Sequence, residues 1–275
     1  MKNRILLVAS SLALLISCMD VKTDFTSYVD PKIGSGGHGH VFVGANVPFG
    51  MVQLGPTSIP QSWDWCSGYH DSDSTVIGFS HTHLSGTGIG DLFDITIMPV
   101  VGDSLTYARG RESEPESGLW SYADRTKEIA RPGYYSVPLT RYGIKAEMTA
   151  SCYVGMHRYT FPKSDDAGIV INLMNGGCWD RPMDAYLEVV DPKTGQRTED
   201  QNSGYAVRGY RYSRGWADDQ KVYFYAEFSK PYKDLGIHSI DYKPYYAKAD
   251  FDTRSGEQIL MKVALSPVSM ENAYE

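Results

Sequence analysis

The chain has 275 residues, enough for one large domain or two smaller ones. Charged residues make up 21% of it and the net charge is −7, with no basic stretch that would mark a nucleic-acid surface. We therefore expect no nucleic-acid partner.

The N-terminus reads as a targeting segment. Two basic residues precede an apolar run over residues 5–16, which is too short to span a bilayer. The run ends in Leu-Ile-Ser-Cys18, a pattern that resembles a bacterial lipoprotein cleavage site. An ordinary secretory cleavage site is the alternative. We expect residues 1–17 to be a signal peptide, Cys18 to carry lipid and residues 18–24 to form a tether. The mature protein would be an exported lipoprotein, anchored to a membrane and facing the periplasm or the cell surface.

Strand patterns dominate the rest of the chain. Apolar and polar residues alternate clearly over residues 144–149, 222–229 and 259–265. Shorter runs of strand composition are residues 51–54, 75–79, 95–101, 153–161, 169–174, 185–190 and 205–212. Residues 191–195 have the composition of a hairpin turn. Many short strands at this spacing predict an all-β, antiparallel sandwich or barrel.

The last residues carry the clearest helix signal. Ser269 is a good N-cap for the segment that follows it, and the sequence ends at Glu275, one turn into that helix. We expect residues 25–268 to form the β domain. Residues 269–275 would begin a linker helix toward a further domain, so that the sequence is the N-terminal part of a longer protein.

Two segments, residues 34–50 and 63–94, differ from the strands around them. They are rich in glycine, and the second also holds aromatic residues, histidines and aspartates. Its aromatic faces, from Trp63, Trp65 and Tyr69, suit stacking on a sugar. The acceptors for sugar hydroxyls nearby are Asp64, Asp71 and Asp73. A small aromatic cluster under a loop is the alternative, and the paired tryptophans favour a binding surface.

Four histidines form two pairs with one residue between the members, an arrangement that places both side chains of a pair on one face of a strand. The pairs are His38 with His40 and His81 with His83. We favour ligand contact, then histidines satisfied within glycine-rich turns, and a metal site last. Asp91 and Asp94 could add oxygens to such a site, but the spacing matches no closed zinc motif.

Nucleophilic or acid–base chemistry has little support. Cys66 could act as a nucleophile with His70, His81 or His83 as its base, although a thiol that only lines the site is the stronger interpretation. Cys152 and Cys178 are either paired or merely buried. The carboxylates at residues 165–166 and 218–219 are adjacent in turn-like contexts and indicate solvated charge. We identify no acid/base pair and no catalytic residue. The glycine-rich runs lack a phosphate-binding lysine.

Two long motifs resemble a known family. YVDPKIGSGGHGHVFVGANVPFGMVQLGP and WDWCSGYHDSDSTVIGFSHTHLSGTGIGD are similar to the N-terminal domain of glycoside hydrolase family 92, and the likeness runs from about Phe25 to Glu275. Members are mostly exo-acting, calcium-dependent, inverting α-mannosidases. They pair an N-terminal β-sandwich with a C-terminal (α/α)6 domain, and the sugar lies between the two.

The resemblance implies roles for named residues. Near the terminal mannose it places Trp63, Asp64, Trp65, Cys66 and Tyr69. The histidines that would brace this surface or touch the sugar are His38, His40, His81 and His83. The acid, the base and the calcium ligands would belong to the helical domain, so that no metal ligand falls in this sequence. The chain departs from the family pattern at Val41-Phe42-Val43, at Asp71 and at Phe93, where Thr-Phe-Pro, Tyr and Gly are common.

The resulting hypothesis is one wall of the sugar pocket of an exported α-mannosidase that removes terminal mannose from glycans. Two alternatives come from other classes of protein. A stand-alone carbohydrate-binding module would bind mannose without the helical domain, and chelation would not weaken that binding. A metalloenzyme built on the four histidines would contain stoichiometric metal.

Overall fold

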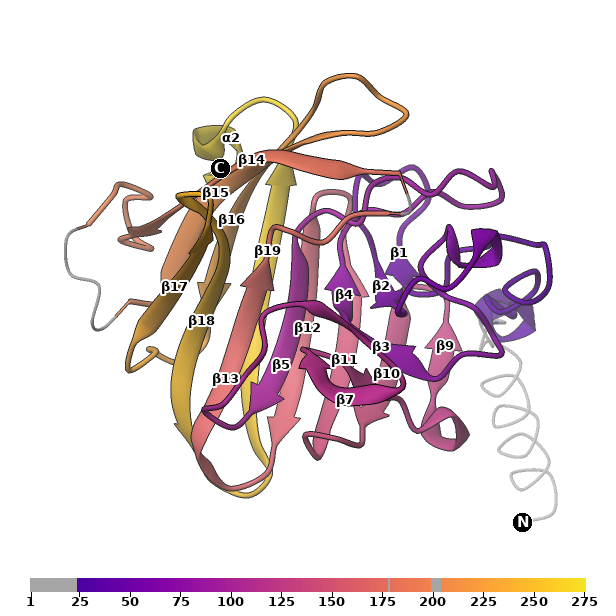
Figure 1. Cartoon of the computed structure of the whole chain (residues 1–275), viewed down its shortest axis with the longest axis horizontal. Helices are drawn as coiled ribbons and strands as arrows, with labels where there is room; N and C mark the ends of the chain where they lie inside the picture. The colour runs from indigo at the N-terminus through magenta and orange to yellow at the C-terminus, as the bar shows by residue number, and fades with distance from the viewer. Residues whose placement is uncertain (1–23, 178, 199–203) are drawn as a thin grey trace, which may run out of the picture.

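The computed structural model describes residues 24–177, 179–198 and 204–275, and it shows an all-β protein built from two antiparallel sheets (Figure 1). The predicted signal peptide, the lipid-bearing Cys18 and the thiol of Cys178 lie outside these residues. Within them, no helix has the length and the apolar character needed to cross a membrane.

The first sheet has seven strands within the described residues. In spatial order they are β1 (Ala45–Asn46), β2 (Gln53–Thr57), β4 (Gly78–Ser80), β5 (Thr96–Val101), β13 (Ser164–Asn172), β18 (Lys243–Thr253) and β17 (Leu235–Ile240). The second sheet has eight. They are β14 (Arg181–Val190), β15 (Ala206–Arg214), β16 (Gln220–Phe228), β19 (Glu257–Ser266), β12 (Val154–Phe161), β11 (Ile144–Ala150), β10 (Tyr134–Leu139) and β9 (Ile129–Arg131).

Shorter elements connect and cover the sheets. Two small ribbons pair β3 (Thr75–Val76) with β8 (Ser121–Tyr122) and β6 (Arg109–Arg111) with β7 (Glu114–Gly118). The helical turns are η1 (Phe25–Tyr28), η2 (Trp63–Trp65), η3 (Arg125–Lys127) and α2 (Met270–Tyr274). Figure 1 shows the loops that carry residues 34–50 and 63–94 gathered at the β1 end of the sandwich.

The core lies between the two sheets, as the alternating patterns predict. In β19 every second side chain from Ile259 onward is buried, and in β11 the core side chains are Ile144, Ala146 and Met148. Phe79 of the first sheet faces Tyr159 of the second at 6.3 Å between ring centroids, and Phe228 faces Phe251 at 5.7 Å. Each large apolar side chain buried in this way contributes about 1.5–3 kcal/mol to folding. The predicted antiparallel sandwich is therefore confirmed.

Two predicted local features are present as expected. Asp191 and Gln196 are joined by a backbone hydrogen bond of 2.9 Å across the turn, where Gly195 has a φ of +67°. At the C-terminus the Ser269 side chain accepts from the backbone N–H of Asn272 and caps α2. The helix buries Ala273 against the second sheet.

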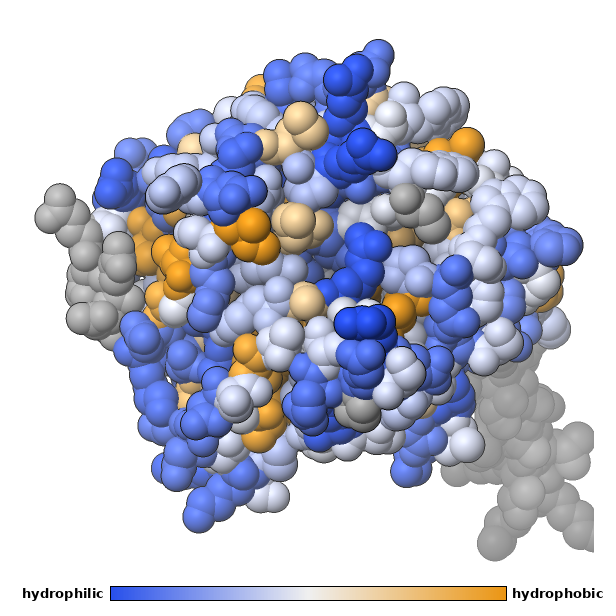
Figure 2. Space-filling model, in the orientation of Figure 1, coloured by the Kyte–Doolittle hydropathy of each residue, from blue (hydrophilic) through white to orange (hydrophobic). Residues whose placement is uncertain are grey.

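Surface charge follows the predictions in one respect and differs in another. Asp165, Asp166, Asp218 and Asp219 are all exposed. Residues 165–166, however, lie within β13 and not in a turn, because that strand begins at Ser164. The face of the molecule in Figure 2 is mostly hydrophilic, with apolar residues in small separate patches.

Candidate functional site

The site is built around Trp63, the first residue of η2. Its side chain is 54% exposed, an unusual state for a tryptophan. The indole Nε1–H donates to the carbonyl oxygen of Gly88 at 2.8 Å and fixes the ring. Gly88 has a φ of +67°, and a Cβ there would lie 2.9 Å from the indole ring. Only glycine allows this close approach.

Asp64 joins the two histidines of the glycine-rich segment. One carboxylate oxygen lies 2.7 Å from His38 Nδ1 and 3.0 Å from His40 Nε2. Because an ionised carboxylate only accepts, both ring nitrogens must carry hydrogen and donate. These hydrogen bonds, His38 first, hold the pKa of Asp64 below its usual value. The group therefore presents a carboxylate at neutral pH.

His40 is held more rigidly than His38. Its φ is +54°, a left-handed conformation that is uncommon outside glycine. Its carbonyl accepts from the Ser67 hydroxyl and from the backbone N–H of Gly86, at 2.7 Å for the latter. Its ring packs on Trp63 with centroids 4.2 Å apart. The His38 side chain, by contrast, is 80% exposed.

Trp65 and Asp73 serve the loop itself. Trp65 stacks on His70 with ring centroids 4.4 Å apart and donates Nε1–H to Asp73 at 2.6 Å. Asp73 also accepts from the backbone of Thr75 at 2.7 Å, so that both of its oxygens are occupied within the loop. Asp71 is exposed and lies 3.7 Å from a lysine side chain. Of the three predicted hydroxyl acceptors, Asp64 is thus the one placed beside an exposed tryptophan.

Cys66 and Tyr69 lie beneath this surface, and both are buried. The Tyr69 hydroxyl donates to Glu128 at 3.1 Å, and the Arg125 guanidinium lies 4.4 Å from its ring centroid. Burial raises the pKa of Tyr69 to about 12. The thiol of Cys66 is inaccessible in this structure, which favours the lining role over the nucleophilic one. Both residues support the loop from within.

His81 and His83 do not join the first histidine pair. His81 Nδ1 donates to the carbonyl of Ile95 at 2.6 Å, and its Nε2 faces His157 across the core. His83 Nδ1 donates to the carbonyl of Gln53 at 2.8 Å. Burial lowers the pKa of both His81 and His83 to about 4. A metal site made of all four histidines is therefore not assembled.

Asp91 and Asp94 are also occupied elsewhere. Asp94 is buried, with one oxygen 2.5 Å from Arg211 and the other accepting from Thr82 at 2.8 Å. An oxygen of Asp91 accepts from the backbone N–H of Trp216 at 3.1 Å. Neither carboxylate belongs to the group formed by His38 and its neighbours, contrary to the suggestion that they could add oxygens there.

Two further exposed tryptophans escaped the sequence analysis. Trp179 is 48% exposed and Trp216 is 71% exposed. The backbone of Trp179 donates to the carbonyl of Gly90 at 2.8 Å, and Asp91 holds Trp216 as described. With Trp63 bound to Gly88, three exposed tryptophans are tied to one short segment. The available signal was glycine shortly before each tryptophan, at residues 176–177 and at residue 215.

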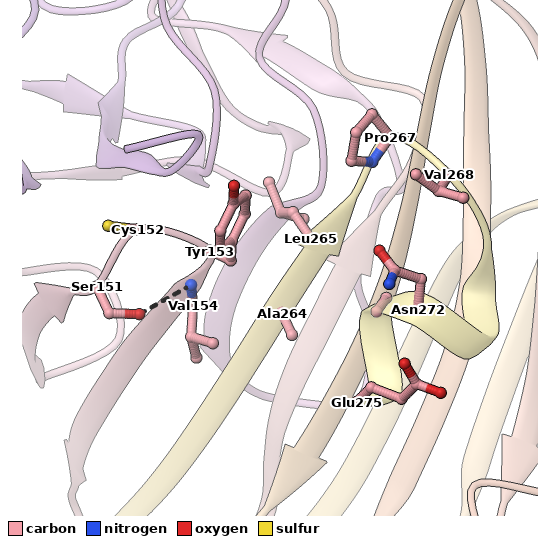
Figure 3. A pocket seen from close by; sticks show the side chains of 11 residues that line it. Ser151, Cys152, Tyr153, Val154, Ala264, Leu265, Pro267, Val268, Asn272 and Glu275 are labelled. Atoms are coloured by element: carbon pink, nitrogen blue, oxygen red, sulfur yellow. Dashed lines mark hydrogen bonds between the residues drawn. The ribbon is translucent and has the colours of Figure 1, made fainter. Parts of the chain in front are cut away.

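A separate hollow of about 680 Å³ lies between the ends of β12 and β19 and the helix α2 (Figure 3). Most of its lining is apolar, from Tyr153, Leu265, Pro267 and Val268. Tyr153 and Val268 are exposed, and so is Cys152. Cys178 lies outside the described residues, so that the question of a Cys152–Cys178 pair stays open.

The donor atoms of the site do not fit calcium. Among the described residues, His38, His40 and Asp64 are the group whose ligand atoms all lie within 4.8 Å of one another. Calcium takes six to eight oxygen ligands, whereas this group offers two nitrogens and one carboxylate. The expectation of a calcium site in the helical domain is untouched by this result.

Known proteins resemble the chain over most of its length. Residues 28–266 match the glycosyl hydrolase family 92 N-terminal domain. A family GH92 α-mannosidase of Bacteroides thetaiotaomicron, solved with mannoimidazole, is 36% identical and superposes with a TM-score of 0.79 over 90% of this chain. An inverting GH92 mannosidase of the same organism is 24% identical with a TM-score of 0.70 over 92% of this chain, which shows the fold alone.

A curated relative adds one more comparison. An uncharacterized secreted glycosidase of Arthroderma benhamiae is 32% identical over 143 residues, 52% of this chain. The chain spans 18% of that protein and 33% of each of the two solved mannosidases. It therefore corresponds to one part of these longer relatives.

Proposed function

The chain belongs to glycosyl hydrolase family 92, whose N-terminal domain it matches, and on this premise we propose that it forms one wall of the sugar pocket of an α-mannosidase. The full-length enzyme would hydrolyse terminal α-mannosyl residues of glycans. The observation that carries the proposal is the exposed indole of Trp63, fixed by Gly88 beside the carboxylate of Asp64.

The chemistry of this surface suits a sugar. The C–H face of a pyranose stacks on an exposed indole. This stacking contributes most to affinity when the indole is already held in place before the sugar binds. Asp64 accepts hydrogen bonds, and His38 offers its exposed Nε2 edge to a hydroxyl. Tyr69 and Cys66, together with the buried pair His81 and His83, would support this wall without touching the sugar.

The acid and base of hydrolysis would come from the remainder of the full-length enzyme. In an inverting mechanism an acid protonates the leaving oxygen while a base activates water on the opposite face. The lowered pKa of Asp64 keeps it ionised at neutral pH, which suits a hydroxyl acceptor and not a general acid. Inversion is stated in the name of one mannosidase that shares the fold. Calcium would be bound by that remainder, because the donors here do not fit it.

The hollow beside α2 is the place where we expect the remainder to pack. Its apolar lining and the exposed Tyr153 and Val268 are typical of a surface that another domain covers. The relatives are about three times as long as this chain, so that they contain enough additional sequence for such a domain. We also propose export, which the secreted relative supports, and a lipid anchor at Cys18.

Hydrolysis of α-linked mannobioses tests the proposal. The 275-residue chain and a full-length homologue are assayed side by side, with and without calcium. We expect turnover by the homologue alone, and only with calcium. Turnover by the short chain would show that an acid/base pair lies within it and would overturn the proposed division of roles.

Mannose binding by the short chain separates the proposal from a stand-alone binding module. One wall of a pocket holds a sugar weakly, so that we expect no saturable binding at millimolar mannose. Saturable binding that survives chelation would favour the module instead.

A further inference from the structure

The geometry points to a binding site for a divalent transition-metal ion at His38, His40 and Asp64. The three ligand atoms are His38 Nδ1, His40 Nε2 and a carboxylate oxygen of Asp64, and they lie within 4.8 Å of one another. Two imidazoles and one carboxylate are a common donor set for zinc and its neighbours in the first transition row. The inference does not depend on the proposed mannosidase function.

The spacing of the donors is close to what such an ion requires. Ligands about 2.0–2.1 Å from a tetrahedral zinc ion lie about 3.3 Å from one another. The carboxylate oxygen is now 2.7 Å from His38 and 3.0 Å from His40. The two imidazole nitrogens lie within 4.8 Å of one another. Entry of the ion asks the imidazoles to move away from the oxygen by a few tenths of an ångström and to turn their nitrogens from that oxygen toward the ion. The exposed His38 side chain can make that movement freely.

The site is also partly preorganised and open. His40 is fixed by the contacts of its carbonyl and by its packing on Trp63, so that one ligand pays little ordering entropy. In the metal-free protein both histidines donate to Asp64. On binding, each imidazole proton moves to the other ring nitrogen and the freed lone pair binds the metal. Both rings stay neutral. The three protein ligands leave a fourth position toward solvent, as in zinc sites that bind an exogenous ligand.

Cobalt and zinc titrations of the intact chain, stripped with a chelator and kept reduced, test the site. We expect one equivalent of Co²⁺ to produce a saturable visible d–d spectrum without a thiolate charge-transfer band, and one equivalent of Zn²⁺ to abolish it. Asp64→Asn and His38→Ala should each weaken Zn²⁺ binding at least tenfold while the thermal unfolding midpoint of the metal-free protein stays within a few degrees.

His238→Ala is the matched control, since this exposed histidine lies on β17, at the opposite end of the first sheet from β1. It should bind both metals as the unsubstituted chain does. Absence of saturable cobalt binding would overturn the inference. So would equal zinc affinity in Asp64→Asn, or a charge-transfer band showing that a cysteine is the ligand.

Discussion

His81 and His157 meet across the interface of the two sheets, with their Nε2 atoms 3.0 Å apart. The partners fix the tautomers. His81 Nδ1 donates to the carbonyl of Ile95, so its Nε2 must accept from His157. His157 Nδ1 then accepts from the hydroxyl of Tyr159 at 2.8 Å. This chain of hydrogen bonds is complete only while both rings are neutral.

Protonation of the buried histidines His81, His83 and His157 should destabilise the fold in mild acid. Burial lowers the folded-state pKa of His81 and His83 from 6.5 to about 4. A lowered pKa means that the contribution to stability is fully present above pH 6.5 and is lost as the pH falls toward 4. At pH 5 each of these two histidines should lower the free energy of unfolding by about 2 kcal/mol. Burial also lowers the pKa of His157.

Urea unfolding between pH 8 and 5 measures this loss. A chelator is present throughout, so that metal binding does not contribute to the measured stability. A free energy of unfolding that stays constant over this range would contradict the buried, neutral network.

At Phe93, substitution by glycine should destabilise the protein less than substitution by alanine, the reverse of the usual order. Its φ is +67°, which explains why glycine is common at this position of the family. Either substitution loses the buried ring, at about 3–5 kcal/mol. Phe93→Ala also keeps the left-handed strain, so that Phe93→Gly should be the more stable by about 1 kcal/mol.

Phe79 provides the matched comparison for this prediction. It is equally buried, but it lies in the strand β4, where Phe79→Gly should be less stable than Phe79→Ala by about 0.5–1 kcal/mol. Urea midpoints of the four variants give the answer. The same ranking at both positions would show that backbone conformation is not the cause.

The sequence predicted the strands whose own alternation is clear and missed others. β11 and β19 alternate with one buried face, and both were found. β10 was missed, because Pro138 interrupts a run that would otherwise indicate a strand. β18 was missed because charged residues such as Lys248 occupy it, although Lys248 is buried and pairs with Asp250.

The contacts of the candidate site were likewise predictable only where they join residues close together in the sequence or in recognisable motifs. Trp63 and Asp64 are neighbours in the chain, and the resemblance of both glycine-rich segments to one family domain predicted that His38 and His40 would lie against the same surface. The destination of His81 depends on His157, 76 residues later, and on which strands pair. Local patterns contain no such information. The position of Trp216 likewise depends on a distant contact, the hydrogen bond from its backbone N–H to Asp91.

Arg211 should be among the most sensitive positions for stability. Its guanidinium is fully buried between Asp94 and Asp180 and also donates Nε–H to the carbonyl of Leu173 at 3.0 Å. Arg211→Met leaves two buried carboxylates without their partner, which should cost about 3–5 kcal/mol.

An exposed ion pair gives the control for Arg211. Arg214 lies 3.3 Å from Asp218, and the two side chains are 63% and 89% exposed. Arg214→Met should therefore cost less than about 1 kcal/mol. Equal losses in the two variants, measured by urea unfolding at pH 7, would contradict a special role for the buried arginine.

Trp63 should matter for sugar binding more than for folding. In the full-length protein, Trp63→Ala removes the stacking face and should weaken binding of mannoimidazole by about 1–2 kcal/mol, a factor of roughly 5–30 in Kd. The free energy of unfolding should fall by about 1 kcal/mol, since the bond to Gly88 and the packing on His40 are lost. Tyr242→Ala, at a fully exposed aromatic residue between β17 and β18, should change neither quantity by a measurable amount. Calorimetric titration of both variants distinguishes the outcomes, because an unchanged Kd in Trp63→Ala would place the sugar against another surface, with the exposed Trp216 as the next one to substitute.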